Sequence, residues 1–310
     1  MISVVAAIFN EEKIVSELIL RLEKALGAID KDYEVILVDD GSRDSTVDIV
    51  MRANARNPKI KLIQFSRNFG QVYAIRAGLR YSKGDITVLM DGDLQDQPEE
   101  IPKLIEKMNE GYDVVYACRS NRQDSLYRRV GSRVFVILMR FLIPENELPA
   151  GHEMIFAGVF RALRRDVVDA LNSLPERTVY IQGLIHWVGF SKALVDVRHG
   201  KRAYGKSNWT FSKLFQYALD ALISFSPYPL RKISIFGMVM AFGSGLLGIG
   251  YFLQRLFIGT RSEGFTTIVL LILFIGGLQL FLFGVIGEYV GRMYIESKGR
   301  PLYIIKRKFL

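Results

Sequence analysis

The stretch Ile86–Glu100 reads ITVLMDGDLQDQPEE and indicates how the N-terminal part of this chain folds. The run Ile86–Met90 is apolar or β-branched, as in a buried strand, and two aspartates follow it within three positions. Pro98 then opens a helical pattern. The same alternation recurs along the chain and predicts an α/β domain with a parallel, doubly wound sheet. The expected strands are 2–9, 34–38, 60–65, 86–90 and 114–117, and the expected helices are 14–26 (ended by Gly27), 45–55, 72–81 and 98–108.

Acidic residues follow these strands at their carboxyl ends, where sheets of this kind bind ligands. Glu11 follows the first strand, Asp40 the second, and Asp91 and Asp93 the fourth. Carboxylates two positions apart in a turn can hold Mg²⁺ or Mn²⁺, which substrate phosphates commonly complete. Neither G-x-x-x-x-G-K nor a G-x-G-x-x-G after a strand occurs, which argues against a P-loop NTPase and a nicotinamide enzyme. Asp39 is expected to cap a turn.

Two apolar segments near the C-terminus predict transmembrane helices. Ile233–Leu253 and Phe265–Gly287 carry no charged residue, and each can cross a hydrocarbon core of about 30 Å. Buried core helices are the alternative, against which the length and the all-round apolarity argue. Basic residues flank the outer ends of the pair, and no secretory signal begins the chain, so both ends are expected in the cytoplasm.

The net charge of +9 over 310 residues fits a membrane partner better than nucleic acid, because much of the basic excess lies beside the apolar segments. The segment 211–223 has apolar residues at helical spacing. It is either an amphipathic helix on the membrane surface or an ordinary helix packed on the domain. The single cysteine, Cys118, is expected to be a small buried residue.

The motifs together resemble glycosyltransferase family 2. They are IFNEE from residue 8, VDDGSRDST from 38, RNFGQ from 67 and MDGDLQDQPEEI from 90. The later LPERTVYIQGLIHWVGF and RHGKRAYGKSNW, with two C-terminal spans, resemble the polyprenyl-phosphate glycosyltransferases of that family, over essentially the whole chain. The resemblance implies a GT-A type Rossmann-like nucleotide-diphospho-sugar transferase domain plus two C-terminal transmembrane helices. RNFGQ itself is interpreted as a pocket wall or a helix start.

The resemblance also implies which residues form the site. The D-x-D acids are expected to bind the metal, the D-D-G-S acid the nucleotide, the Q-D-x-P-E element the donor sugar, and the basic loop the acceptor phosphate. The implied residues are, for catalysis, Asp93, Asp96 and Glu153; for substrate binding, Glu12, Asp40, Asp91, Gln95, Arg119, Arg122, Arg202, Lys206 and Ser207; and for Mg²⁺ or Mn²⁺, Asp91 and Asp93. His199 lies in the basic loop and is given no role.

The sequence departs from the family pattern at one position. Relatives often carry D-x-G before F-R-L-M, and the aspartate position falls here on Phe156. Glu153 and His152 are the titratable residues just upstream. The acceptor is a phosphate monoester with a second pKa of about 6, so it is anionic at neutral pH and depends less on a general base.

The implied function is metal-dependent, inverting transfer of a hexose from a nucleotide-sugar to polyprenyl (undecaprenyl) phosphate at the cytoplasmic face of the inner membrane. Glucose from UDP-glucose is the first choice, and mannose or a modified sugar from a GDP- or UDP-donor is the alternative. A processive polysaccharide synthase is disfavoured, because Q-x-x-R-W is absent. A non-catalytic or partner-dependent homologue is the remaining hypothesis, and it rests on Phe156.

The expected organisation has four parts. They are a cytoplasmic catalytic domain (1–209), a juxtamembrane amphipathic region (210–231), a two-helix transmembrane domain (232–290) and a basic cytoplasmic tail (291–310). The expected partners are the nucleotide-sugar, the polyprenyl phosphate and membrane lipid. Glycine-rich spans are compatible with a homo-oligomer.

Overall fold

A computed structural model of the chain describes residues 1–29, 32–119, 158–175, 181–200, 235–239 and 264–310, with isolated residues between 242 and 257. Two compact units make up the chain. The first contains Met1–Ser132, Pro149–Leu214 and Arg300–Leu310, and the second contains Arg133–Leu148 and Phe215–Gly299. The first unit therefore includes both chain ends.

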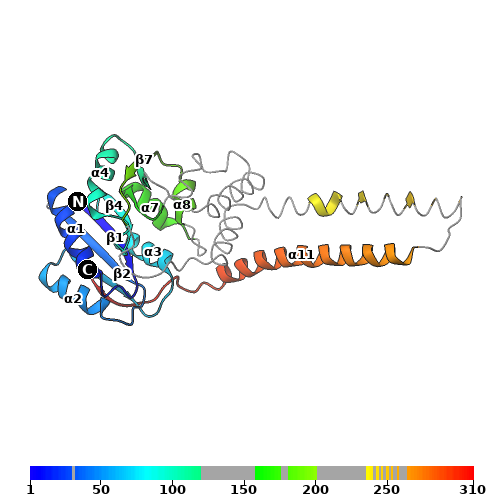
Figure 1. Cartoon of the computed structure of the whole chain (residues 1–310), viewed down its shortest axis with the longest axis horizontal. Coiled ribbons are helices and arrows are strands. Elements are labelled where there is room, and N and C mark those ends of the chain that lie inside the picture. Colours follow the sequence, from blue (N-terminus) through cyan, green and yellow to red (C-terminus); the bar gives the residue numbers. More distant parts are fainter. Residues whose placement is uncertain are drawn as a thin grey trace. The chain divides into compact units, whose positions relative to one another are not determined.

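An eight-stranded sheet forms the centre of the first unit, in the order β7-β5-β6-β4-β1-β2-β3-β8 (Figure 1). Strands β4, β1, β2 and β3 run parallel to one another, as the sequence predicts. The strands are β1 (Ile2–Ile8), β2 (Tyr33–Asp39), β3 (Ile60–Phe65), β4 (Ile86–Asp91), β5 (Val114–Arg119), β6 (Arg161–Arg164), β7 (Lys192–Val197) and β8 (Ile305–Phe309).

The sheet also contains two strands that the sequence does not predict, and they make it mixed: β6 is antiparallel to β4 and β5, and β8 is antiparallel to β3. Neither of these two strands has the apolar run that marks a central strand. Strand β6 reads RALR and is only four residues long. Strand β8 reads IKRKF and lies at the edge of the sheet, where charged side chains can face water.

Helices cover the sheet in two layers. Contacts among α1, α2 and α4 define one layer, and contacts among α3, α7 and α8 define the other. The helices of this unit are α1 (Val15–Ile29), α2 (Thr46–Arg56), α3 (Gln71–Tyr81), the short η1 (Pro98–Glu100), α4 (Ile101–Asn109), α7 (Arg165–Ser173) and α8 (Ile181–Trp187).

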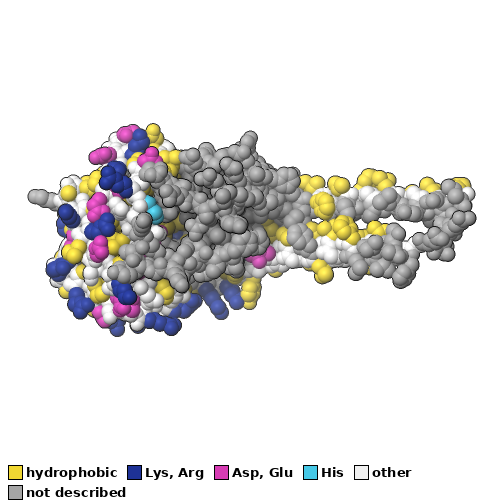
Figure 2. Space-filling view, viewed as in Figure 1, with side chains coloured by type: hydrophobic (Ala, Val, Ile, Leu, Met, Phe, Trp, Pro, Cys, Tyr) yellow, Lys and Arg dark blue, Asp and Glu magenta, His cyan; other side chains and the backbone are white. Residues whose placement is uncertain are grey.

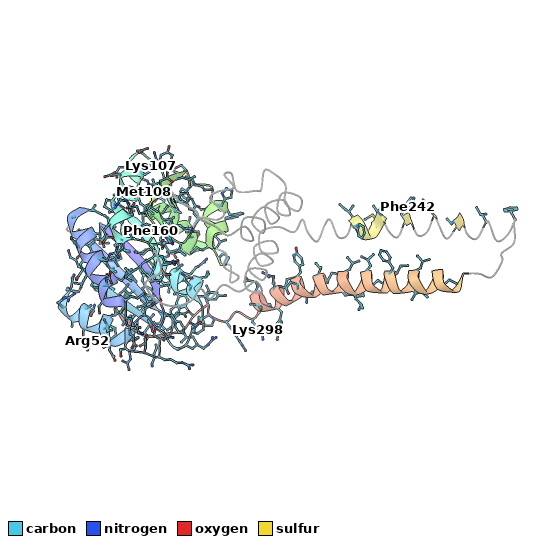
Figure 3. All side chains as sticks on the ribbon, in the orientation of Figure 1. Arg52, Lys107, Met108, Phe160, Phe242 and Lys298 are labelled. Carbon is cyan, nitrogen blue, oxygen red and sulfur yellow. The ribbon has the colours of Figure 1, made fainter. Side chains whose placement is uncertain are left out.

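The hydrophobic core lies between the sheet and the α1 layer. Met108 of α4 and Phe160, which precedes β6, are both buried in it and lie in the same part of the domain in Figure 3. The first helix ends later than the sequence predicts. Helix α1 continues past Gly27 to Ile29, because Ile29 packs against the core and outweighs the poor helix propensity of glycine.

A buried carboxylate lies at the amino end of β2. Glu34 is 3% exposed and accepts hydrogen bonds from Ser3 Oγ (2.5 Å), the Lys83 amide (2.6 Å) and Lys61 Nζ (2.6 Å). Burial raises the pKa of Glu34, but the bonds from Lys61, Ser3 and Lys83 outweigh burial and leave that pKa below its ordinary value. This end of the sheet is therefore electrostatically compensated.

In the second unit, α11 (Phe265–Ser297) is long and apolar. Its exposed side chains include Leu280 and Phe283, and hydrophobic side chains line its visible surface in Figure 2. Among the described residues, Phe274–Ser297 is the one segment long and apolar enough to cross a membrane. Isolated described residues of the earlier apolar segment, such as Phe242 (Figure 3), are helical and exposed, but most of that segment lies outside the described residues.

Candidate active site

Three loops meet where β1, β2 and β4 end. In the sheet register, Ile8 of β1 lies beside Asp39 of β2, and Ala7 of β1 lies beside Asp91 of β4. The acidic residues after β2 and β4 therefore flank the end of β1 on its two sides. This is the juxtaposition that the sequence predicts, because parallel neighbouring strands end at the same edge of a sheet.

Hydrogen bonds join the loop after β1 to the loop after β2. The Asn10 amide donates to Ser42 Oγ (2.8 Å), and the Arg43 amide donates to Asn10 Oδ1 (2.9 Å). Asn10 has a φ of 55°, a left-handed conformation that asparagine tolerates better than most residues. Glu12, a predicted substrate ligand, accepts from the amide of Ser45 (3.1 Å) at the start of α2. This hydrogen bond from Ser45 to Glu12 therefore holds the two loops together.

The two aspartates after β2 have different partners. Both oxygens of Asp39 accept from the Ser42 amide (3.2 Å each), which is the expected turn-capping role. Asp40 accepts from the Phe69 amide at Oδ1 (2.7 Å) and from the Gly70 amide at Oδ2 (2.9 Å). Asp40 therefore fastens the loop before α3 to the end of β2, a contact that the sequence analysis did not predict.

Burial raises the pKa of both aspartates. For Asp40, burial outweighs the hydrogen bonds from Phe69 and Gly70 and the attraction of Arg67. For Asp39, burial outweighs its bonds to Ser42, and the nearby charge of Asp40 raises the pKa further. Carboxylates with raised pKa values in a cluster are typical of functional sites.

The turn after β4 carries the D-x-D acids. Asp91 Oδ1 accepts from Gln71 Nε2 (2.5 Å), and Asp93 Oδ1 accepts from the Gln95 amide (3.1 Å). A side chain at Gly92 would collide with Ala7, since a Cβ there would lie 2.7 Å from its carbonyl oxygen. Only glycine lets this turn lie so close to β1. The helix that begins at Gln71 agrees with the helix start predicted at RNFGQ.

Asp96 joins this turn to the end of β7. It is 5% exposed, and its Oδ2 accepts from the Asp91 amide (3.2 Å). Asp96 forms a backbone bridge with His199, whose Nδ1 lies 3.5 Å from Asp96 Oδ1, and the Gly200 amide donates to the Gln95 carbonyl (2.9 Å). The sequence gives His199 no role, because nothing in its local pattern pairs it with a residue about a hundred positions away.

Several predicted site residues lie outside the described residues. Arg119 ends β5, but its side chain is not among those described. The others are Arg122, Glu153, Phe156, Arg202, Lys206 and Ser207. The residues brought together by the described structure are Glu12, Asp40, Asp91, Asp93, Gln95 and Asp96.

The described residues can bind a divalent ion whose coordination the phosphates of the substrate complete. No group of three or more His, Cys, Asp or Glu side chains able to hold a metal occurs in the described part of the chain. Asp91 and Asp93 supply carboxylate oxygens in one turn. Mg²⁺ is commonly held by one or two carboxylates together with substrate phosphates, so this pair is a chemically suitable donor set.

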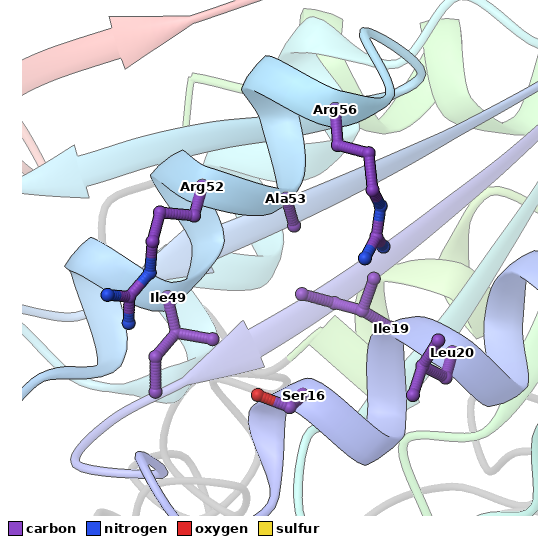
Figure 4. Close-up of a pocket in the computed structure, with 7 residues that line it drawn as sticks. All are labelled: Ser16, Ile19, Leu20, Ile49, Arg52, Ala53 and Arg56. Carbon is purple, nitrogen blue, oxygen red and sulfur yellow. The ribbon is translucent and has the colours of Figure 1, made fainter.

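A shallow pocket lies elsewhere, between α1 and α2, with Arg52 and Arg56 from α2 and Leu20 from α1 among its lining residues (Figure 4). It is on the helical layer and not at the loops that follow the strands. None of the acidic residues described above lines it. The candidate active site is therefore the set of loops at the strand ends.

The fold and these loops define a class of protein, a glycosyltransferase with a GT-A Rossmann-like α/β domain. Residues 3–171 match Glycosyl transferase family 2, and the chain belongs to that family. The domain is similar to glucosyl-3-phosphoglycerate synthase from Mycobacterium tuberculosis, solved with Mn²⁺, uridine diphosphate and phosphoglyceric acid. The TM-score is 0.52 at 21% identity over 72% of this chain and 76% of that chain, a likeness of fold.

The relatives that match almost the whole chain include the following two. An undecaprenyl-phosphate 4-deoxy-4-formamido-L-arabinose transferase from Pectobacterium atrosepticum is 38% identical, over 99% of this chain and 93% of the relative. A bactoprenol glucosyl transferase from Shigella phage SfV is 36% identical, over 99% of this chain and 98% of the relative. The similarity extends beyond the sheet domain into the apolar C-terminal part.

Proposed function

We propose that this glycosyltransferase moves one hexose from a nucleotide-sugar, with UDP-glucose as the first candidate, to undecaprenyl phosphate. The observation that carries the proposal is the meeting of Asp40, Asp91 and Asp93 at one edge of the sheet. Full-length similarity to a bactoprenol glucosyl transferase supports the acceptor and the sugar. The apolar, exposed surface of α11 supports a lipid-bound acceptor, because the acceptor chain resides in the membrane.

The proposed reaction is a single in-line displacement with inversion. An oxygen of the acceptor phosphate attacks the anomeric carbon, the bond from that carbon to the donor diphosphate breaks, and the nucleoside diphosphate leaves with the electron pair. The acceptor is already anionic at neutral pH, so alignment and stabilisation of the leaving group carry most of the rate enhancement. Retention of the donor configuration in the product would refute this mechanism.

The described residues divide this work. We assign Asp91 and Asp93 to a Mg²⁺ or Mn²⁺ ion, which when bound neutralises charge on the leaving diphosphate. Asp40 helps to position the nucleotide part of the donor, because it holds the loop before α3 in place. Asp96 holds the turn after β4 in place. The proposed roles of the residues outside the described part, listed above, remain those that the family resemblance implies.

The proposal includes the organisation of the chain at the membrane. We propose two spans, within 232–290, with the catalytic domain 1–209, the juxtamembrane region 210–231 and the segment 291–310, whose strand β8 joins the sheet, on the cytoplasmic side of the inner membrane. The charge distribution around the apolar segments supports this orientation. A homo-oligomer is compatible with the glycine-rich spans.

A second donor has a specific observation in its favour. The relative from Pectobacterium transfers a formamido-arabinose, a modified sugar, and is as similar to this chain as the glucosyl transferase. Both relatives are named for the same class of acceptor, so the fold does not identify the donor sugar. A panel of donor sugars has to be tested to identify it.

Transfer of radiolabelled sugar tests the proposal. The full chain in lipid is incubated with undecaprenyl phosphate, Mn²⁺ and each of a panel of UDP- and GDP-sugars. We expect lipid-soluble label from one donor, lost on chelation and reduced about 10²–10³-fold in Asp93→Asn, the range for loss of a group that stabilises the transition state. Asp48→Asn, a surface acid on α2, is the matched control. Folded protein that binds a nucleoside diphosphate but labels no lipid would favour the non-catalytic homologue.

A further inference from the structure

The C-terminal segment Arg300–Leu310 belongs to the sheet unit, although it follows the apolar helix α11 in the sequence. Strand β8 pairs with β3, with Phe309 opposite Leu62 and Ile305 opposite Phe65. The Ser66 amide donates to the Ile304 carbonyl (2.9 Å), so the pairing continues past the end of β3. The chain that leaves α11 therefore lies along the edge of the sheet and reaches the strand ends.

An aromatic stack connects this segment to the loop before α3. The Tyr303 ring stacks on the Phe65 ring, with centroids 4.9 Å apart and planes inclined by 13°. Phe65 is 1% exposed and meets Phe69 edge-on, with centroids 5.7 Å apart. Burial raises the pKa of Tyr303, as expected for a ring packed against the domain. Three rings from two separate segments, 65–69 and the C-terminal segment, thus pack together.

Phe69 lies in a loop that holds two acidic strand ends. Its amide and that of Gly70 donate to Asp40, and the next residue, Gln71, donates to Asp91. The Arg67 guanidinium lies 4.0 Å from the centre of the Phe69 ring on the same loop. Displacement of Phe69 would therefore disturb the partners of Asp40 and Asp91 together.

The loop is also fixed from the side of β2. Gly41 has a φ of 79°, and a Cβ there would lie 2.4 Å from the Arg67 carbonyl carbon. The loop is thus pressed against the turn after β2 on one side and held through Phe65 and Phe69 on the other. Tyr303 packs on the outer face of this arrangement.

We propose that Tyr303 is a positioning residue for the nucleoside diphosphate donor. Its ring, through Phe65 and Phe69, keeps the loop 67–71 in the place where Asp40 and Asp91 retain their hydrogen bonds. Tyr303 does not act on the reacting atoms. The inference rests on the proposed function, since it assumes that this edge of the sheet binds the donor, and it assigns the segment after α11 a part in donor binding.

The alternative is that the segment only covers the edge of β3 and stabilises the sheet. The two accounts differ in what an aromatic substitution should change. Phe309 is in the same segment and is half-buried against the core, but it pairs with Leu62, well before the strand end. Loss of its ring should lower stability without moving the loop, so Phe309→Ala is the matched control.

The test uses the full chain in lipid nanodiscs. UDP and GDP binding is measured by calorimetry in the presence of Mn²⁺, with the unfolding temperature and the KM values for donor and acceptor. For Tyr303→Ala we expect a donor Kd and KM about three- to tenfold higher, the range for loss of an aromatic pair, with acceptor KM and kcat unchanged. Tyr303→Phe should restore wild-type binding, and Phe309→Ala should lower the unfolding temperature alone.

Two results would overturn the inference. They are wild-type affinity in Tyr303→Ala, or an equal loss of affinity in Phe309→Ala. If Tyr303→Ala does not fold, Tyr303→Leu keeps the apolar volume without the ring and is judged by the same criteria. A wild-type chain that binds neither UDP nor GDP would instead contradict the proposed function, so the two failures are distinguishable.

Discussion

Replacing Asp40 with asparagine tests whether this carboxylate holds the loop before α3. Asp40 accepts from the amides of Phe69 and Gly70, one at each oxygen. Asparagine has nearly the same shape but one acceptor oxygen and one NH₂ group. One of the two amides would then face a donor and lose its bond, while the backbone of the turn stays compatible with the new side chain.

The magnitude follows from the kind of bond that is lost. A hydrogen bond to a charged group contributes about 1.5–3 kcal/mol, which corresponds to a change of about ten- to hundredfold in the opening equilibrium of the loop. The global free energy of unfolding should change by less, because burial raises the pKa of Asp40 and a neutral side chain removes part of that desolvation penalty. The expected signature is local opening in a domain that remains folded.

Hydrogen–deuterium exchange with mass spectrometry measures this opening directly. In Asp40→Asn, peptides that cover 67–71 should exchange about ten- to hundredfold faster, and peptides from β1 should exchange as in the wild type. Asp39→Asn is the control, since Asp39 is equally buried but accepts from Ser42 instead. Unchanged exchange at 67–71 in Asp40→Asn, or the same increase in Asp39→Asn, would refute the reasoning.

Two further substitutions have clear expected outcomes. Gly92→Ala places a Cβ 2.7 Å from both the Ala7 carbonyl oxygen and Ile8 Cγ2, so it should destabilise the domain by about 1–3 kcal/mol in chemical denaturation. Gly27→Ala on α1 is the control, because the space around Gly27 is open and the substitution should be neutral or slightly stabilising. Equal changes in the free energy of unfolding for the two variants would contradict this expectation. Glu34→Gln should destabilise by about 1–3 kcal/mol at neutral pH. The folded pKa of Glu34 is lowered, so its stabilisation is complete above the ordinary value of 4.5 and disappears as the pH falls through the folded value. Denaturation curves of wild type and variant should therefore converge in acid, and a constant difference would contradict the assignment.

The sequence predicts the part of the fold that is encoded by local pattern. Strands β1 to β5 are rich in apolar and β-branched residues, and the loops after β1, β2 and β4 can be assigned to one edge because neighbouring parallel strands end together. The acids at that edge therefore follow from the order of elements, without any knowledge of side-chain contacts.

What the sequence does not predict depends on pairing between distant segments. Strand β8 consists largely of basic residues, which indicate a tail on a membrane surface until β3 is known to offer an open edge. The contacts from Asp40 to the loop at Phe69, from Asp96 to His199 and from Tyr303 to Phe65 likewise join segments with no shared local pattern. Such contacts are set by tertiary packing, which propensity and periodicity do not describe.

The buried carboxylates at the two ends of β2 have pKa values shifted in opposite directions, a contrast that agrees with the proposed function. Glu34 at the amino end receives three donors, including the ammonium group of Lys61, and its pKa is lowered, so its charge stabilises the fold. Asp39 and Asp40 at the carboxyl end are equally buried, but their bonds do not outweigh burial and their pKa values are raised. Their stabilisation is therefore greatest when they are protonated and is lost as the pH rises through the raised values. A chain selected for stability alone could place neutral residues there. The proposed function gives a reason for two aspartates whose burial is not outweighed by their hydrogen bonds, because the hydroxyl and amide groups of a bound nucleoside can donate further hydrogen bonds to carboxylates.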